Sequence, residues 1–514
     1  MKNEEKLKAL GGIDPEFIDS AARLKKKKSP LWGIGIAAAA ALCLGLGTFL
    51  AASMLADKSD EKTASADPTP VPIVTEAPTA EPPEKTDAPA HTDDPSDVGM
   101  IVPAMELPEG VSASFAAVPD VPNTFGKSGY YTYMSNLRRS WYHAGDTLAG
   151  FYGKTTAEFL LSGEEGENTI YSPFNVYMAL AMMAETASGE TRAQILDLLG
   201  ASSIEALREQ ANRLFVSNYF DNDVLTILPA AALWIDSSST PYLKADVLNT
   251  LSNEYHSSTF IGDMEDPEFT KLCRKWLNEQ THDLLTDQVE ELELKPGELM
   301  HLITTLYYKA GWANEFIASR NTVEPFHSPA GDEQATFMHG GADSYRELNG
   351  FSIAAKMFNE YAKIWFVLPD EGVDLDTVIA EGKALDVILS GSDEGRVDGA
   401  IIHLNLPKFD VESKLDLVKG LKNLGVTYCF DAEKADFTEL TDLQDVCISN
   451  ITHGVRVIAD EEGVEAAAYT DVGYAGSAEP IREVDFTLDR PFMFVITSPD
   501  GTPLFVGTVY HPGA

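Results

Sequence analysis

The chain has 514 residues, 44% of them hydrophobic, which is enough to bury a sizeable core. Its formal net charge is −42, from 80 acidic and 38 basic residues, which argues against nucleic acid or an anionic membrane surface as a partner. The four cysteines are widely scattered, so they exclude a disulfide framework and predict buried free thiols.

The N-terminal end combines a charged segment with a long apolar run. Residues 1–30 include the basic stretch 25–28, and residues 31–55 contain no charged side chain. A run of this length can span a bilayer, and positive charge before it favours a cytoplasmic N-terminus. We therefore predict a transmembrane helix, a signal-anchor, at 31–55, with the rest of the chain outside the cell. A cleaved signal peptide is the alternative, although the leading segment and the apolar run are both longer than usual.

Residues 56–110 have the composition of an extended linker. They hold ten prolines together with many Thr, Ala, Asp and Glu residues, and no Phe, Tyr or Trp. Such a segment cannot bury a core, so we expect a disordered stalk that lifts the following domain off the membrane. The folded domain is expected to occupy residues 111–514.

Helical periodicity dominates the first half of this domain, and strand patterns dominate the second. The expected helices cover residues 146–161, 176–186, 190–199, 203–214 and 269–287. The expected strands cover residues 299–308, 362–368, 401–406, 447–451, 492–497 and 503–509. Asp500-Gly501 marks a hairpin turn between the last two strands. This order of elements predicts an α+β fold rather than regular βαβ units.

No catalytic or metal-binding pattern stands out in the chain. The sequence has no His-Glu-x-x-His, no Gly-x-Ser-x-Gly and no Cys-x-x-Cys, and its ten histidines are scattered. We therefore expect no cofactor, no bound metal and a function that is not enzymatic.

The most distinctive segment lies near the C-terminus. Alternate side chains from Val464 to Thr470 are small or apolar, as in a strand with one buried face. Residues 473–480, which follow, have the composition of an exposed loop. A strand pattern that continues into a loop predicts a segment stored outside a sheet and later inserted into it. An ordinary edge strand followed by a turn is the alternative.

Short motifs elsewhere in the domain give this segment a context. They are residues 168–176, 189–191, 306–312, 406–409, 424–426, 435–437, 461–468, 490–494 and 504–509. Each is weak alone, but in this order they resemble the serpin family over roughly residues 129–514. With its predicted anchor, the chain resembles a bacterial-type membrane-anchored member. The resemblance implies the serpin fold, in which three β-sheets with surrounding helices carry an exposed reactive-centre loop.

Inhibitory serpins are suicide substrates of serine proteases. The resemblance implies that a protease attacks the exposed loop and that the cleaved loop inserts into the large sheet before the acyl-enzyme is hydrolysed. We therefore expect a covalent complex between a monomer of this protein and an extracellular serine protease. A non-inhibitory binding or scaffold protein of the same fold on the cell surface is the alternative.

The resemblance also assigns the parts of the loop. The hinge comprises Glu461, Glu462, Gly463, Val464, Glu465, Ala466, Ala467, Ala468, Tyr469 and Thr470. Val464 stands where the family usually has Thr, but it is also β-branched and apolar. Counting from the hinge glycine places the reactive bond at Ser477–Ala478. Small residues at this bond suit an elastase-like or subtilisin-like protease.

Five positions match the region where the large sheet must open. They are Ser172, Asn175, Thr304 and His453, the shutter residues, and Trp312 near the end where the loop would enter. We expect a buried His453 that faces Ser172 and Asn175. The family usually has Asn at the position of Thr304, so we infer that the amide has moved across to Asn175. In the alternative interpretation, His453 and Trp312 are ordinary core residues, and a buried polar group still needs a partner.

Overall fold

The structure is a computed structural model that describes residues 105, 107–116, 144–221, 224–295, 297–464 and 482–513. The chain divides into two units, Met1–Thr92 and Asp93–Ala514, and every described residue belongs to the second. The transmembrane helix predicted at 31–55 and most of the predicted stalk therefore lie outside the described residues. Within the described ranges, no helix is both long enough and apolar enough to cross a membrane.

The described part of the chain contains ten α-helices and three β-sheets. The helices are α5 Ala144–Leu160, α6 Pro173–Thr186, α7 Gly189–Leu199, α8 Ile204–Ser217, α9 Ala245–Glu254, α10 Pro267–Thr281, α11 Thr286–Glu290, α12 Leu375–Glu381, α13 Lys383–Leu389 and α14 Val418–Asn423. Short 3₁₀ turns occupy Thr240–Tyr242, Ala318–Arg320, Asn359–Tyr361 and Tyr428–Phe430. This mixture confirms the α+β fold predicted from the sequence.

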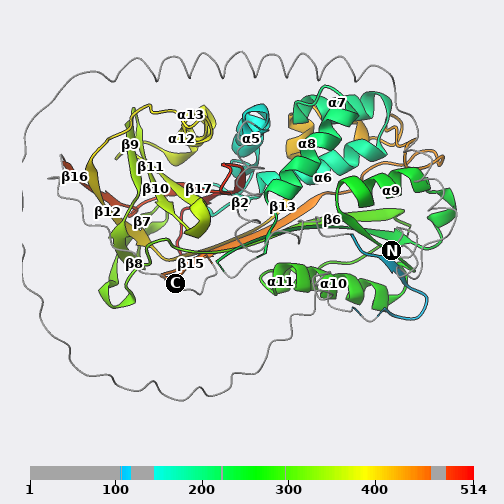
Figure 1. Ribbon diagram of the computed structural model, residues 1–514, viewed down its shortest axis with the longest axis horizontal. Coiled ribbons are helices and arrows are strands. Elements are labelled where there is room, and N and C mark those ends of the chain that lie inside the picture. Colours follow the sequence, from blue (N-terminus) through cyan, green and yellow to red (C-terminus); the bar gives the residue numbers. More distant parts are fainter. Residues whose placement is uncertain are drawn as a thin grey trace, which may run out of the picture. The chain divides into compact units, whose positions relative to one another are not determined.

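The largest sheet has eight strands. They are β1 Ser112–Ser114, β3 Phe220–Asp221, β4 Leu225–Asp236, β5 Ser257–Gly262, β6 Met300–Gly311, β13 Phe409–Asp416, β14 Thr452–Ala459 and β15 Gly463–Val464. Their hydrogen-bonded order is β1-β5-β4-β6-β15-β14-β13, and β3 pairs with β4 outside this path. Figure 1 shows α6 to α9 on one side of this sheet and α10 and α11 on the other.

Two smaller sheets complete the fold. The six-stranded sheet has the order β2 Ile170–Tyr171, β18 Pro503–Val509, β17 Phe492–Thr497, β11 Lys363–Pro369, β10 Phe351–Met357 and β9 Ser344–Leu348. The four-stranded sheet has the order β16 Arg482–Thr487, β12 Ala400–Pro407, β8 Gly331–Gly341 and β7 Thr322–Ser328. All the residues of β17 and β18 are buried, and these two strands form the predicted hairpin.

Local sequence explains where several helices begin. Ser172 is the N-cap of α6, where its hydroxyl accepts a hydrogen bond from the Asn175 N–H and Pro173 occupies the first turn. Asp266 caps α10 in the same way, again with a proline following. Such caps satisfy the N–H groups that a helix start leaves without a partner, and proline loses nothing there because it has no N–H.

Two of the predicted elements are wrong. The strand predicted at 447–451 is replaced by β14, Thr452–Ala459, whose buried positions alternate from His453 onward. The helix predicted at 269–287 ends at Thr281, because His282 adopts a left-handed conformation with φ 50° and Asp283 follows with φ 62°. The short helix α11 then begins as a separate element. Propensity alone does not reveal such an end, because neither residue is a glycine.

The buried apolar residues form two clusters. The larger one joins α5 to α9 with the inner faces of the sheets, and the smaller one lies between α10 and strands β4 and β5. Met105 belongs to the smaller cluster and is 8% exposed, although it falls in the range expected to form the stalk. Cys273 and Cys429 are buried free thiols as predicted, whereas Cys447 is exposed.

Candidate functional site at the hinge and the opening of the large sheet

The start of the predicted hinge already forms a short strand inside the large sheet. β15 pairs antiparallel with β6 through Val464 and Ala310, and with β14 through Val464 and Ala459. Val464 is 3% exposed, which confirms that its side chain faces the interior. Gly463 has φ 156°, a value that residues with a side chain rarely adopt, and this explains the glycine at this position.

Beyond β15, no described strand pairs with the facing edges of β6 and β14. β6 extends over twelve residues, but only Ala310 and Gly311 pair with β15, and no ladder joins β6 directly to β14 among the described residues. A cavity of about 10 Å³ lies beside Val464, lined by residues of both strands and of the layers above and below them. The lining residues are Leu284, Leu306, Tyr308, Arg456, Val457, Ile458, Val464 and Phe505. Unpaired strand edges are the place where a further strand can add.

Two sets of bonds fix the segment that leads into β15. Trp312 donates from its indole Nε1 to the Asp460 carbonyl at 2.8 Å and from its backbone N–H to the Glu462 carbonyl at 3.0 Å. The Glu461 carboxylate pairs with Lys408 Nζ at 2.6 Å and accepts from Asn321 Nδ2 at 2.5 Å. Burial opposes ionisation of Glu461, but the hydrogen bond from Lys408 and those from its neighbours hold its pKa below the usual value. The hinge is thus anchored immediately before the residues that would insert.

Trp312 itself packs against two aromatic rings. Its ring stacks on Phe358 with centroids 4.5 Å apart and meets Phe316 edge-on at 5.7 Å. Lys356 is 2% exposed, with its ammonium 4.5 Å from the centre of the Phe316 ring and 5.5 Å from that of Trp312. It donates to the Gly341 carbonyl, and burial lowers its pKa to about 8. Trp312 therefore lies where the sequence predicted, at the end of the sheet where the hinge enters.

The structure brings three of the four shutter residues together. His453 is 7% exposed, and its Nε2 accepts a hydrogen bond from the Ser172 N–H at 2.9 Å. Asn175 contacts the opposite strand: with its carboxamide oriented so that both atoms have partners, the nitrogen donates to the Thr305 carbonyl and the oxygen accepts from the Leu306 N–H, both at 3.2 Å. The start of α6 thus touches β14 through Ser172 and β6 through Asn175, on both sides of the unpaired edges.

Thr304 does not take part in this network. Its backbone pairs with Ala231 of β4, and no side-chain hydrogen bond from Thr304 occurs among the described residues. The Asn175 amide reaches β6 at the peptide between Thr305 and Leu306 rather than at Thr304. The neighbouring Thr305 hydroxyl and the Tyr308 hydroxyl are buried without a hydrogen-bond partner. β6 therefore carries two buried hydroxyl groups whose hydrogen-bonding capacity is not satisfied among the described residues.

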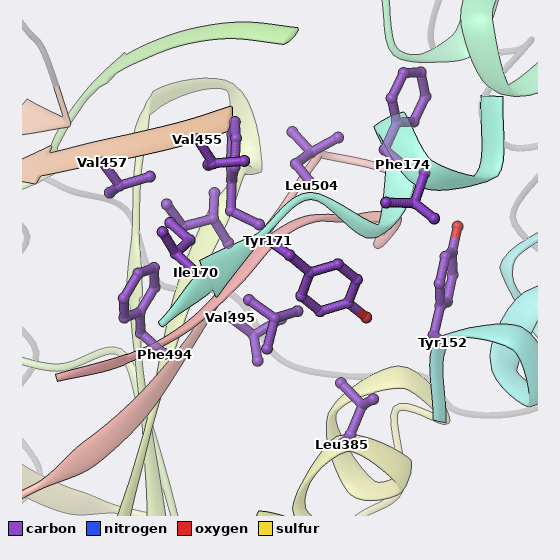
Figure 2. Packing of buried hydrophobic residues seen from close by; sticks show 14 of the residues in the cluster. Tyr152, Ile170, Tyr171, Phe174, Leu385, Val455, Val457, Phe494, Val495 and Leu504 are labelled. Atoms are coloured by element: carbon purple, nitrogen blue, oxygen red, sulfur yellow. The ribbon is translucent and has the colours of Figure 1, made fainter. Parts of the chain in front are cut away.

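The shutter sits on a densely packed core. Figure 2 shows β2 running into α6, with Ile170 near Val455 of β14 and Tyr171 near Val495 of β17. The Ile170 N–H also donates to the Ser413 hydroxyl of β13 at 2.9 Å. Because the interior on this side is rigid, an added strand must be accommodated by movement of the sheet and of the opposite layer.

Acid should destabilise this arrangement through His453. Burial lowers its pKa from 6.5 to about 4, so the folded protein holds the ring neutral. The stability linked to the neutral ring is complete above pH 6.5 and is lost as pH falls to about 4. A shift of this size corresponds to about 3 kcal/mol. We expect a His453→Gln variant to lose correspondingly less stability between pH 7 and pH 4 in denaturant titrations. Equal pH slopes for both proteins would contradict the assignment.

The rest of the loop lies outside the described residues. This applies to the hinge positions Glu465, Ala466, Ala467, Ala468, Tyr469 and Thr470 and to the reactive bond Ser477–Ala478. The roles of these residues stay predictions.

Sequence reasoning did not find the contribution of Lys408, Asn321 and Lys356 to the hinge. No linear signal could have paired Lys408 with Glu461, because the fold alone brings strand ends so distant in the chain together.

This geometry agrees with comparisons to known proteins. The family profile described as Serpin (serine protease inhibitor) matches residues 154–512, which is most of the chain. The chain therefore belongs to the serpin family.

Individual relatives are distant but align over about two thirds or more of the chain. Serpin-Z2B of Oryza sativa subsp. japonica is 26% identical over 381 residues, which span 67% of this chain and 91% of the rice protein. The plasma serine protease inhibitor of Mus musculus is 27% identical over 371 residues, with 69% and 87% covered. The native stressed conformation of AtSerpin1 from Arabidopsis matches with a TM-score of 0.63 at 24% identity, covering 72% and 98%. Human thyroxine-binding globulin complexed with its ligand matches with a TM-score of 0.62 at 23% identity, covering 73% and 100%. These solved structures show the shared fold.

Proposed function

We propose that this protein is a suicide-substrate inhibitor of serine proteases that traps an acyl-enzyme by inserting its cleaved loop into the large sheet. The observation that carries the proposal is β15. The hinge enters the sheet at Gly463 and Val464, and among the described residues no strand pairs with the edges of β6 and β14 beyond this point. A loop that continues from this point after cleavage finds hydrogen-bonding groups waiting on both sides.

The chemistry of cleavage belongs to the protease. Its serine attacks the carbonyl of the scissile residue, the amine of the following residue leaves, and an ester joins the protease to the new end of the loop. Insertion of the freed loop then competes with hydrolysis of that ester. New ladder hydrogen bonds and burial of apolar surface drive insertion, and the attached protease is carried along and distorted.

The composition of the hinge suits rapid entry. On the face shared with Val464, the next positions are Ala466, Ala468 and Thr470, all small or β-branched and without charge. The cavity beside Val464 is only about 10 Å³, so each side chain that follows needs the sheet to move, and small side chains need the least movement. A serpin-fold binding protein is the alternative, in line with the ligand-bound globulin that shares the fold. Bulky or charged residues at these hinge positions would have favoured that alternative.

The site of attack and the target class follow from the spacing. We place the reactive bond at Ser477–Ala478, where small side chains fit the shallow specificity pocket of an elastase-like or subtilisin-like protease. Arg482, the nearest basic residue, begins strand β16 and lies too far along the chain to favour a trypsin-like protease.

A protease panel tests this proposal. Incubation with an elastase-like or subtilisin-like serine protease is expected to give a complex that survives denaturing electrophoresis, with a mass equal to the protease plus the cleaved inhibitor. The same proteases inactivated at their serine should give no such band. If every active protease only cuts the loop and keeps its activity, the inhibitory mechanism is wrong.

We further propose that residues 31–55 anchor the protein in the cell membrane, with the N-terminus in the cytoplasm and the serpin domain outside. Removal of residues 1–56 is then expected to release a soluble protein that still traps proteases, whereas the full chain fractionates with membranes. Added protease should reach the domain from outside intact cells. Accessibility only after cell lysis would contradict this orientation.

A further inference from the structure

The large sheet carries an extra strand at the edge far from the hinge. β1 pairs antiparallel with β5, with Ser112 opposite Ile261 and Ser114 opposite Thr259. The Ala116 N–H extends this contact by donating to the Ser258 hydroxyl at 3.1 Å. Figure 1 shows this segment in blue beside the sheet, close to α10. The segment that leads into the domain therefore includes a strand of the large sheet, the sheet that must open during insertion.

Side chains of the same segment fill the interface between the sheet and α10. Met105 is buried in the cluster that contains Trp234 of β4 and Trp276 of α10. Phe115 packs edge-on against Phe260 of β5, with ring centroids 5.6 Å apart. Val111 and Ala113 pack against this cluster too. The segment, residues 105–116, thus binds the sheet and α10 to each other.

The next helix extends this contact to the unpaired edges. Gln288 of α11 donates to the Glu412 carboxylate of β13 at 2.7 Å, and Arg456 of β14 donates to the Leu284 carbonyl at 3.4 Å. α11 lies so close to β14 that a Cβ on Gly454 would be 2.2 Å from the Gln288 side-chain oxygen. Leu284 also lines the cavity beside Val464. The α10–α11 layer therefore covers the place where a new strand would enter.

We propose that residues 105–116 are a latch that holds the α10–α11 layer on the large sheet and thereby keeps the sheet closed to its own loop. A strand entering between β6 and β14 widens the sheet and has to displace the α11 contacts, so α10 must shift on β4 and β5. Met105 and Phe115 resist that shift because it would open the apolar cluster they fill. This inference rests on the proposed insertion mechanism, and it makes the N-terminal approach to the domain a regulator of trapping.

Single substitutions in the full-length protein test the latch. Met105→Asp and Phe115→Asp place a charge in the cluster, whereas Leu107→Asp, on the same segment at 37% exposure, serves as the matched control. Phe115→Leu keeps an apolar side chain and should behave like the wild type. Two quantities are measured without any protease: hydrogen exchange of the amides in α11 and β14, and the rate at which each protein converts at moderate temperature into a more heat-resistant form.

We expect the two cluster variants to exchange at least tenfold faster in α11 and to convert at least tenfold faster, while the amides of β17 and the Leu107→Asp control stay as in the wild type. Unchanged exchange in α11, or a lower melting temperature with faster exchange throughout the domain, would overturn the latch. Faster exchange confined to α11 without any heat-resistant form would overturn loop insertion and with it the role of the latch. Normal trapping with unchanged exchange would overturn the latch alone.

Discussion

Replacing Val464 by arginine is expected to convert the protein from a protease trap into a plain substrate. Val464 is 3% exposed between Ala310 and Ala459, so an arginine there must lose its hydration inside the sheet. Because Val464 already lies in β15 before cleavage, we expect the arginine to keep β15 out of the sheet, so that insertion must first bury the charge. Burial of an unpaired charge costs several kcal/mol, and each 1.4 kcal/mol on the insertion barrier slows insertion about tenfold. Even part of this cost lets hydrolysis of the acyl-enzyme win.

The measurement is the ratio of trapped complex to cleaved inhibitor after reaction with an elastase-like or subtilisin-like protease. Val464→Arg should still be cut near Ser477, but at least tenfold less of it should end in the complex, and the cleaved product should gain less heat resistance than the cleaved wild type. Glu465→Arg is the matched control, because strand alternation directs this neighbour to the other face. Equal trapping by wild type and Val464→Arg would refute both the inward assignment and the insertion mechanism.

At Val464 the sequence prediction agrees with the structure because the signal is local. The period-two pattern around Val464 places one face inward, and the structure buries that side chain in the sheet. The hairpin of β17 and β18 was equally predictable, since two apolar runs flank a turn dipeptide. The motif order fixed the family, and with the family came the expectation of a buried His453, which the structure confirms.

What the sequence could not supply depends on contacts between distant parts of the chain. The pairing of Lys408 with Glu461 exists only because β12 ends beside the hinge in the folded protein. Residues 105–116 have no strong strand pattern, and β1 forms because β5 offers an open edge and α10 offers an apolar pocket for Met105. The end of α10 at His282 is a left-handed cap made by a residue type that rarely signals one.

The shutter residues show which contacts a family resemblance can predict and which it cannot. The family pattern pointed to a polar side chain on β6 at Thr304, and the inferred exchange placed the amide on α6 instead. In the structure the Asn175 carboxamide lies against β6, but the partners available to it are the backbone groups of Thr305 and Leu306 rather than a side chain. A hydrogen bond to backbone needs no particular residue at the partner position, so no sequence pattern could have disclosed it.

Asn175→Ala is therefore expected to weaken the closed sheet strongly. The change removes the carboxamide contacts to the Thr305 carbonyl and the Leu306 N–H of β6. An unsatisfied buried group costs about 1–3 kcal/mol, so we expect the free energy of unfolding to fall by about 2–4 kcal/mol. An inserted strand would supply new partners to β6. The loss of stability therefore affects the protein before insertion more than the protein after insertion. Spontaneous conversion to a heat-resistant form should accelerate at least tenfold.

Thr304→Val is the matched control, since the Thr304 side chain has no hydrogen bond among the described residues and the two side chains have the same shape. This variant should keep the stability and the trapping ratio of the wild type. The exchange of partners can be tested directly with the double variant Asn175→Ser and Thr304→Asn, which returns the amide to the position usual in the family. If an amide on either strand can hold the shutter, the double variant should convert more slowly than Asn175→Ser alone. Loss of stability in Thr304→Val as large as in Asn175→Ala would show that Thr304, and not Asn175, carries this contact.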